Sequence, residues 1–249
     1  MEKMGIELNV DLFKRKKKNQ NINVHLDEHT PFQITEAYKT VRTNLLFSLA
    51  PHKSKAMVIS SALPSEGKST TCSNIAIAMA QTEARVLLID ADLRKPTQHK
   101  VFKRPNNFGL SGILTGFDTV EQAIQKNICR NLDLITSGQI PPNPSELLGC
   151  ENRGFLLEEL SKHYDYIFID SPPINIVTDA IVLANQVAGI VLVARQGQST
   201  YNELEKAVSS IEFANANILG LVLTEVRDQG GPYGHYRYKY HYRYEMEKM

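Results

Sequence analysis

One short segment constrains this chain more than any other, because it places a lysine between a predicted strand and a predicted helix. The apolar run 56–61 is followed by Ala-Leu-Pro-Ser-Glu-Gly-Lys-Ser-Thr, and a helical pattern covers 74–80. A turn of this kind points consecutive backbone N–H groups at an anion. Its ending is that of a phosphate-binding P-loop, with Ala62 in place of the first glycine of the usual pattern.

The side chains of this segment suit a nucleotide with its metal ion. The Lys68 ammonium can place a positive charge between the β- and γ-phosphates. The Ser69 hydroxyl can enter the coordination shell of Mg²⁺. We expect the phosphate-binding residues to be Pro64, Ser65, Glu66, Gly67, Lys68, Ser69 and Thr70.

Carboxylates stand at the ends of two further predicted strands. Strand 85–90 ends at Asp90, with Asp92 just beyond it, and strand 166–170 ends at Asp170. Ligands of open α/β sheets bind outside the carboxyl ends of the strands. Because Mg²⁺ needs oxygen ligands beyond the phosphates, we expect both strand ends and the loop to converge on one Mg²⁺·nucleotide.

The middle of the chain alternates short β-branched runs with helical patterns. Several runs are apolar throughout, as expected for parallel strands covered on both faces. One helical pattern begins with a capping box between Thr200 and Glu203. The pattern predicts an α/β fold with a mostly parallel, doubly wound sheet, whose strands are 56–61, 85–90, 132–136, 166–170, 189–194 and 218–224.

Composition limits the alternatives and separates the two ends from the middle. The net charge of +1 produces no global attraction to nucleic acid, and no apolar run approaches the roughly 18 residues of a membrane span. The three cysteines form no CxxC pair, so a reduced, cytoplasmic protein is expected. We expect a flexible basic arm over 1–30, a P-loop domain over 31–227 and a flexible tail over 228–249. The basic run 14–18 is either a solvated segment or a contact with anionic lipid.

The predicted tail is rich in tyrosine. It could form an edge strand, or it could bind single-stranded nucleic acid through alternating aromatic and basic residues. It has nothing apolar to bury in a core, so a flexible phosphate acceptor is the favoured interpretation. Six of the ten tyrosines of the chain lie within twelve residues, as Tyr233, Tyr236, Tyr238, Tyr240, Tyr242 and Tyr244.

In combination, these motifs resemble the bacterial protein-tyrosine kinases of capsular and exopolysaccharide synthesis, which are P-loop NTPases of the MinD/ParA-like type. The resemblance rests on Pro-x-Glu-Gly-Lys-Ser-Thr, on Asp-x-Asp-x-Arg, on Ile-Asp-Ser-Pro-Pro, on the stretches 36–44 and 141–148, and on the tail. It is strongest to the cytoplasmic, separately encoded form of Gram-positive bacteria. Ser65 stands where the family usually has glycine, and Lys39 stands where an interface motif has its first arginine.

The resemblance implies a role for each motif. It implies that Lys68, Asp90, Asp92 and Arg94 serve catalysis, and that Ser69, Asp90 and Asp170 hold Mg²⁺ beside ATP. Either Asp90 or Asp92 would accept the proton of a tyrosine hydroxyl. The implied activity is phosphorylation of the tail between neighbouring subunits.

The resemblance also implies partners. It implies a transmembrane adaptor that recruits the cytoplasmic chain to the inner face of the membrane, a homo-oligomeric ring, a cognate tyrosine phosphatase and possible sugar-nucleotide enzyme substrates. No nucleic acid partner is expected.

An amphipathic helix is predicted over residues 32–49. Its apolar face carries Ile34, Ala37, Tyr38, Val41 and Leu45. Its charged face is either solvated or, as the resemblance implies, a subunit interface made by Glu36, Lys39 and Arg42.

Two rival functions share the same fold. ATPases of the ParA and MinD kind have an additional lysine at the position of Leu63, so the lysine that they use is absent from this chain. A nucleotide-binding scaffold would bind ATP without labelling its own tail, and the tail tyrosines would then serve only to bind the adaptor.

Overall fold

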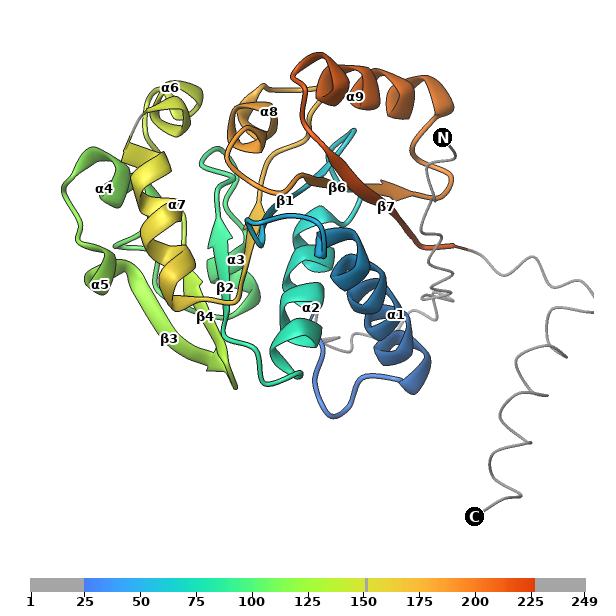
Figure 1. Ribbon diagram of the computed structural model, residues 1–249, viewed down its shortest axis with the longest axis horizontal. Coiled ribbons are helices and arrows are strands. Elements are labelled where there is room, and N and C mark those ends of the chain that lie inside the picture. The colour runs from blue at the N-terminus through green and yellow to red at the C-terminus, as the bar shows by residue number, and fades with distance from the viewer. Residues whose placement is uncertain (1–24, 151, 227–249) are drawn as a thin grey trace, which may run out of the picture.

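The structure is a computed structural model that describes residues 25–150 and 152–226 (Figure 1). The basic run 14–18 and the six tyrosines of the predicted tail lie outside the described residues, so their predicted properties stay predictions. Within the described ranges, no helix is both long enough and apolar enough to span a membrane.

A seven-stranded sheet forms the centre of the molecule, in the order β3-β4-β2-β5-β1-β6-β7. All neighbouring strands are parallel except β3 and β4, which pair antiparallel. The predicted mostly parallel α/β fold is therefore confirmed. The strands are β1 Ala56–Ser61, β2 Val86–Asp90, β3 Ile124–Cys129, β4 Leu132–Ile135, β5 Tyr166–Asp170, β6 Ile190–Arg195 and β7 Ile218–Thr224.

Among the strands, sequence patterns missed only the edge strand β3, and they misplaced a few strand boundaries by one residue. β3 carries Gln, Lys and Asn among its six residues and none of them is fully buried, so it lacks the apolar run that marked the other strands. β6 begins and ends one residue later than predicted, β4 ends one residue earlier, and β2 begins one residue later. An edge strand has only one neighbour, and polar residues are ordinary there.

Helices cover both faces of the sheet (Figure 1). Helices α1 and α2 pack on one face, and α4, α6, α7, α8 and α9 contribute to the core on the other. The helices are α1 Phe32–Leu49, α2 Lys68–Ala80, α3 Gln98–Val101, α4 Leu110–Thr115, α5 Val120–Ala123, α6 Pro144–Gly149, α7 Asn152–His163, α8 Asp179–Ala184 and α9 Tyr201–Phe213.

The central strands supply both cores because successive side chains of a strand point to opposite faces. In β1, Met57 and Ile59 belong to the core beneath α1 and α2, whereas Val58 belongs to the opposite core. All six residues of β1 are buried. Burial on both faces fixes the register of the central strands, and with it the positions of the loops at their carboxyl ends.

The helix predicted over 32–49 is confirmed as α1. Of the predicted apolar face, Tyr38, Val41 and Leu45 are buried against α2 and the sheet, and Ile34 and Ala37 are partly buried against the same core. Leu49, which was not predicted to lie on this face, is buried as well. The capping box at the start of α9 is also confirmed, because Thr200 and Glu203 each bond to the other's backbone N–H.

Candidate active site

The loop between β1 and α2 makes a tight turn through two residues in the left-handed region. Ser65 has φ 66° and Gly67 has φ 88°. Glycine adopts this conformation without steric cost, whereas a side chain there costs roughly 1–2 kcal/mol. The turn itself therefore explains why glycine would suit position 65, and Ser65 carries some backbone strain.

This turn aligns a row of backbone donors at the carboxyl end of β1. Within the described chain, the N–H groups of residues 65–70 have no hydrogen-bond acceptor, and the first helical bond of α2 runs from Thr71 to the Gly67 carbonyl. The first N–H groups of a helix have no partner inside the helix. Six unpaired donors in one turn form a strong anion-binding site.

Lys68 extends from this turn into a cluster of carboxylates. Its Nζ lies 2.9 Å from Asp92 Oδ2, 3.5 Å from Asp170 Oδ1 and 3.1 Å from Ser69 Oγ. Burial by itself lowers the pKa of Lys68, but the charges of Asp170 and Asp92 outweigh burial and raise it above its usual range. Lys68 therefore carries its full charge at neutral pH.

Asp90 and Asp170 are register partners on the adjacent strands β2 and β5, so their carboxylates meet at one edge of the sheet. Asp90 is fully buried. Its Oδ1 accepts the N–H of Asp92, and its Oδ2 accepts those of Thr97 and Gln98. Burial first, and then repulsion from Asp170, raise the pKa of Asp90 to about 7.

Gln98 belongs to the same cluster, although no sequence pattern indicated it. Its Nε2 donates to Asp170 Oδ2 at 2.8 Å and to the Ser69 carbonyl at 3.1 Å. It thereby links the third acidic motif to the start of α2. A single glutamine after Asp-x-Asp-x-Arg carries no local signal, so only the tertiary contact identifies it.

The guanidinium of Arg94, a predicted catalytic group, is directed toward α8. Its Nε donates to Asp179 Oδ2 at 3.0 Å, and its Nη2 contacts Asp179 Oδ1 and Ser145 Oγ. Asp179 is fully buried, and Ser145 also donates to it at 2.6 Å. Ser145 lies in a stretch that carried the family resemblance, but neither partner of Arg94 was predicted.

The phosphate loop is supported from behind by Glu66. This carboxylate is fully buried, accepts the N–H of Leu63 at 2.8 Å and accepts a short hydrogen bond from the Ser199 hydroxyl. Arg195 and Gln198, from the same segment as Ser199, donate to loop carbonyls. The loop is thus preorganised by contacts from more than 120 residues away in sequence, which no local pattern encodes.

The residues present fit a magnesium–nucleotide complex. Unpaired N–H groups and the Lys68 ammonium suit the phosphates, while Ser69, Asp90 and Asp170 offer the oxygen donors that Mg²⁺ prefers. The cluster draws Lys68, Asp92 and Asp170 together, as the sequence predicted. It places the Arg94 guanidinium at its edge.

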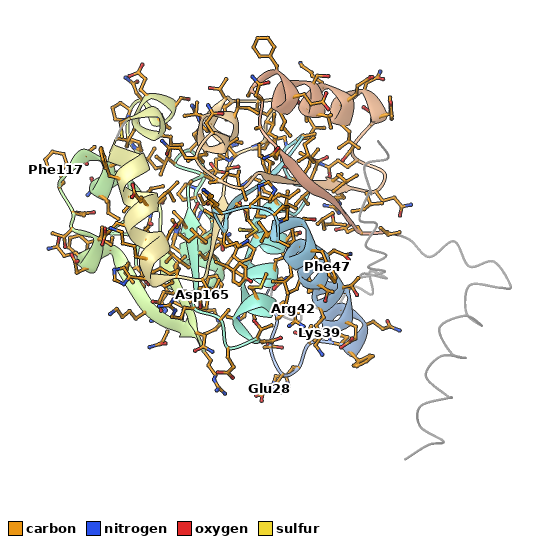
Figure 2. All side chains as sticks on the ribbon, in the orientation of Figure 1. Glu28, Lys39, Arg42, Phe47, Phe117 and Asp165 are labelled. Carbon is orange, nitrogen blue, oxygen red and sulfur yellow. The ribbon has the colours of Figure 1, made fainter. Side chains whose placement is uncertain are left out.

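The residues of the predicted subunit interface are not equivalent. Glu36 and Lys39 pair with each other at 2.7 Å on the surface of α1. Arg42 instead donates from Nη1 to the Ala78 carbonyl of α2 at 2.9 Å. Figure 2 labels both Lys39 and Arg42 on α1. Arg42 therefore has a partner within its own subunit, whereas the other two remain accessible to a neighbour.

The chain is similar to known proteins over most of its length. The family model described as "AAA domain" matches residues 54–218. The putative tyrosine-protein kinase CapB of Staphylococcus aureus is 38% identical over 222 residues, which cover 89% of this chain and 97% of CapB. The tyrosine-protein kinase YwqD of Bacillus subtilis is 40% identical over 203 residues, covering 81% and 86% of the two chains.

Solved structures of related proteins have the same fold. The kinase domain of the Escherichia coli tyrosine kinase ETK superposes with a TM-score of 0.77 at 35% identity, covering 86% of this chain and 87% of that one. MinD of Pyrococcus horikoshii, at 23% identity and a TM-score of 0.59, shares the fold. The sheet order and the phosphate loop thus define a P-loop NTPase of the MinD/ParA-like type. Within that class, the chain belongs to the bacterial tyrosine-protein kinase family.

Proposed function

We propose that this chain transfers the γ-phosphoryl group of ATP to tyrosine hydroxyls of its own C-terminal segment, with Mg²⁺ as cofactor and with the acceptor supplied by a neighbouring subunit. The observation that carries the proposal is the row of unpaired N–H groups at residues 65–70, which ends beside Lys68 and three carboxylates. That arrangement would bring phosphate-binding groups, metal ligands and a proton acceptor together at the carboxyl ends of the central strands.

In this proposal Ser69, Asp90 and Asp170 hold the metal ion, and the loop N–H groups with Lys68 hold the phosphates. Bound Mg²⁺ would neutralise the charge that develops on the phosphoryl oxygens. Phosphoryl transfer requires positioning and charge stabilisation more than covalent chemistry. Gln98 and Arg94 are positioning residues in this proposal. Gln98 orients Asp170, and Arg94 joins the loop after β2 to α8.

We assign the proton acceptor to Asp92 rather than Asp90. Both oxygens of Asp90 already accept backbone N–H groups, and its side chain has no exposed surface for an incoming hydroxyl. The second lone pair of each oxygen can still bind a metal ion held within the site. Asp92 retains a 4% exposed surface and presents Oδ2 to Lys68. An acceptor hydroxyl arriving from outside the subunit reaches Asp92 before it reaches the fully buried Asp90.

Tyrosines of the described residues are poor acceptors compared with the tail cluster. Tyr38 is buried in α1, and the Tyr164 hydroxyl donates to Asp133 at 2.6 Å. Tyr166 begins β5 within the sheet. Tyr201, which is 77% exposed at the start of α9, is the exception. This supports the six tyrosines between 233 and 244 as the acceptors, although they lie outside the described residues.

The proposed biological role is regulation of capsular or exopolysaccharide synthesis. It rests on membership of the same family as CapB and YwqD and on the resemblance of the motifs. The proposal includes a ring of subunits, a transmembrane adaptor that recruits the cytoplasmic chain to the membrane, a tyrosine phosphatase and possible sugar-nucleotide enzyme substrates.

Mass spectrometry of the purified chain with Mg²⁺·ATP, alone and with the cytoplasmic segment of an adaptor, tests this function. Wild type should gain phosphotyrosine, and Lys68→Met should gain none while keeping its circular dichroism spectrum. Asp92→Asn should lose most of the activity but keep its affinity for nucleotide. Normal phosphotyrosine in folded Lys68→Met would contradict the role of the loop. ATP binding without any phosphotyrosine would leave a nucleotide-binding scaffold as the function.

A further inference from the structure

A surface hollow is lined by residues that follow Asp92 in the chain, and the proposed phosphoryl transfer does not use it. Its volume is about 610 Å³, and ten of the described residues line it. It is built largely by the loop and short helix that follow Asp92. The same loop donates the N–H groups of Thr97 and Gln98 to Asp90. The same loop therefore both holds the carboxylate of Asp90 and lines the hollow.

The lining of the hollow is cationic. Its basic residues are Arg94, Lys95 and Lys100, and no acidic residue is among the described residues that line it. The ammonium groups of Lys95 and Lys100 are exposed and form no salt bridge with any described residue, whereas Arg94 is held by Asp179. Two unpaired lysines in one lining attract an anion of high charge.

Polar and apolar groups complete the lining. Thr97 and His99 are among the polar residues. The Thr97 hydroxyl oxygen and His99 Nδ1 lie buried behind the surface, and within the described chain neither has a hydrogen-bond partner. Pro96 and Ile140 supply apolar surface, and the Ile140 side chain is 62% exposed. A phosphate on an aromatic ring would satisfy both parts of this lining, because the ring can cover the apolar residues while the phosphate meets the lysines.

The spacing of the tail tyrosines would let two of them occupy two adjoining sites at once. From Tyr236 to Tyr244 every second residue is tyrosine. In an extended chain, residues two apart point to the same side and lie about 6.6 Å from each other. When one tyrosine is at the catalytic carboxylates, its neighbour in the series is therefore within reach of an adjoining site.

Charge decides which form of the tail the hollow can bind. Between Tyr233 and Tyr244 the tail carries Arg237, Lys239 and Arg243 and no acidic residue, so the unmodified segment is repelled by a cationic lining. A phosphotyrosine adds about −1.5 to −2 charges. The two unpaired lysines can neutralise one such group.

We propose that the hollow lined by Lys95, His99, Lys100 and Ile140 is a phosphotyrosine-binding subsite for the tail. It holds a tyrosine that has already been phosphorylated while a neighbouring tyrosine occupies the catalytic carboxylates. The first phosphate on a tail thereby accelerates the addition of later ones. This proposal rests on the proposed kinase function for its ligand, but binding can be measured without any catalysis.

The binding experiment uses the full chain with its six tail tyrosines changed to phenylalanine, in the presence of ADP and Mg²⁺. Fluorescence anisotropy measures the affinity of a labelled peptide of residues 233–244 that carries phosphate on Tyr238. The unmodified peptide, and a peptide with phosphoserine at 238, should bind at least about tenfold more weakly. Lys95→Ala with Lys100→Ala should weaken binding of the phosphotyrosine peptide by about tenfold, and Lys103→Ala, an exposed lysine outside the lining, should not.

Equal affinity of the double variant and wild-type lining for the phosphotyrosine peptide would overturn the proposal. Equal binding of the phosphoserine peptide would overturn the assignment to tyrosine, because it would show that the hollow recognises phosphate alone. Equal binding of the unmodified peptide would overturn the requirement for phosphate.

A kinetic experiment on the chain with its natural tail separates this proposal from the kinase function. In Lys95→Ala with Lys100→Ala, the first phosphate should appear at the wild-type rate, and species with several phosphates should be delayed at least about fivefold. Loss of the first phosphate as well would place the lysines in catalysis and overturn the subsite. Absence of phosphate from the wild-type chain would refute the kinase function, while the binding result would still stand on its own.

Discussion

The Thr224 hydroxyl donates to the main-chain carbonyl of Glu66 at 3.0 Å, so the end of β7 lies against the phosphate loop. Glu66 is also held through its side chain by Leu63 and Ser199. The loop that would bind ATP is therefore braced by β7 and by the segment between β6 and α9. The structure describes only two more residues before the segment that leads to the tyrosine cluster.

The first prediction concerns this brace. Glu66→Ala should lower the affinity for ADP and Mg²⁺ by about tenfold, because the loop must then be ordered at the expense of binding free energy. Isothermal titration calorimetry measures the change. Gln198→Ala is the matched control, since it removes a bond to the Pro64 carbonyl but leaves Glu66 in place. Unchanged affinity in Glu66→Ala would show that the loop needs no support from this carboxylate.

The second prediction concerns the acceptor. With all six tyrosines between Tyr233 and Tyr244 changed to phenylalanine, self-phosphorylation should fall almost to zero, because the hydroxyls are gone. ATP hydrolysis, or phosphorylation of an added tail peptide, should persist. Peptide mapping by mass spectrometry provides the measurement, and Tyr201→Phe should leave the labelling of wild type unchanged. Phosphate found mainly on Tyr201 would contradict the tail as acceptor.

The third prediction concerns assembly. Glu36→Ala with Lys39→Ala removes an exposed ion pair that contributes little to folding, so thermal stability should change little. If these residues face a neighbouring subunit, the double variant should form smaller particles. Its self-phosphorylation should be slow, and the rate should rise with protein concentration. Arg42→Ala is a different change, because it removes a hydrogen bond between α1 and α2 and should lower thermal stability.

Light scattering measures the mass of wild type, Lys68→Met and the double variant, before and after addition of Mg²⁺·ATP. A head-to-tail contact that closes makes a ring. Six phosphotyrosines would add roughly −9 to −12 charges to a tail, so the wild-type ring should loosen as labelling proceeds, whereas Lys68→Met should stay assembled. Monomers in every sample would refute the ring, and a constant large mass would refute release by charge.

The fourth prediction concerns Asp179, which anchors Arg94 from inside the protein. Asp179→Asn should lower the free energy of unfolding by about 1–2 kcal/mol, because the guanidinium loses its charged partner at a buried carboxylate. Urea denaturation gives the value. Asp165→Asn is the control (Asp165 is labelled in Figure 2). Asp165 pairs with Arg85, and both side chains are exposed, so loss of this ion pair changes stability little. Equal stability of both variants would contradict a structural role for Asp179.

Local sequence patterns determined most of the fold and the core of the candidate site. The central strands were predictable because strands buried on both faces must be apolar along their whole length. Asp90 and Asp170 were predictable because each is the last residue of such a strand, and Lys68 and Asp92 because they follow such a strand closely. The carboxyl ends of parallel strands necessarily meet at one edge of the sheet.

Only the tertiary structure decided which residues support the carboxylate cluster and the phosphate loop. Gln98 meets Asp170, and Ser199 meets Glu66 across 133 residues of sequence. The edge strand β3 and the inward contact of Arg42 were likewise invisible, because polar residues at an edge or on a helix have no periodic signature. Periodicity records which face of an element is buried, but a partner far away in sequence is chosen by how the elements pack. Those long-range hydrogen bonds exist only once the sheet has brought its strand ends together.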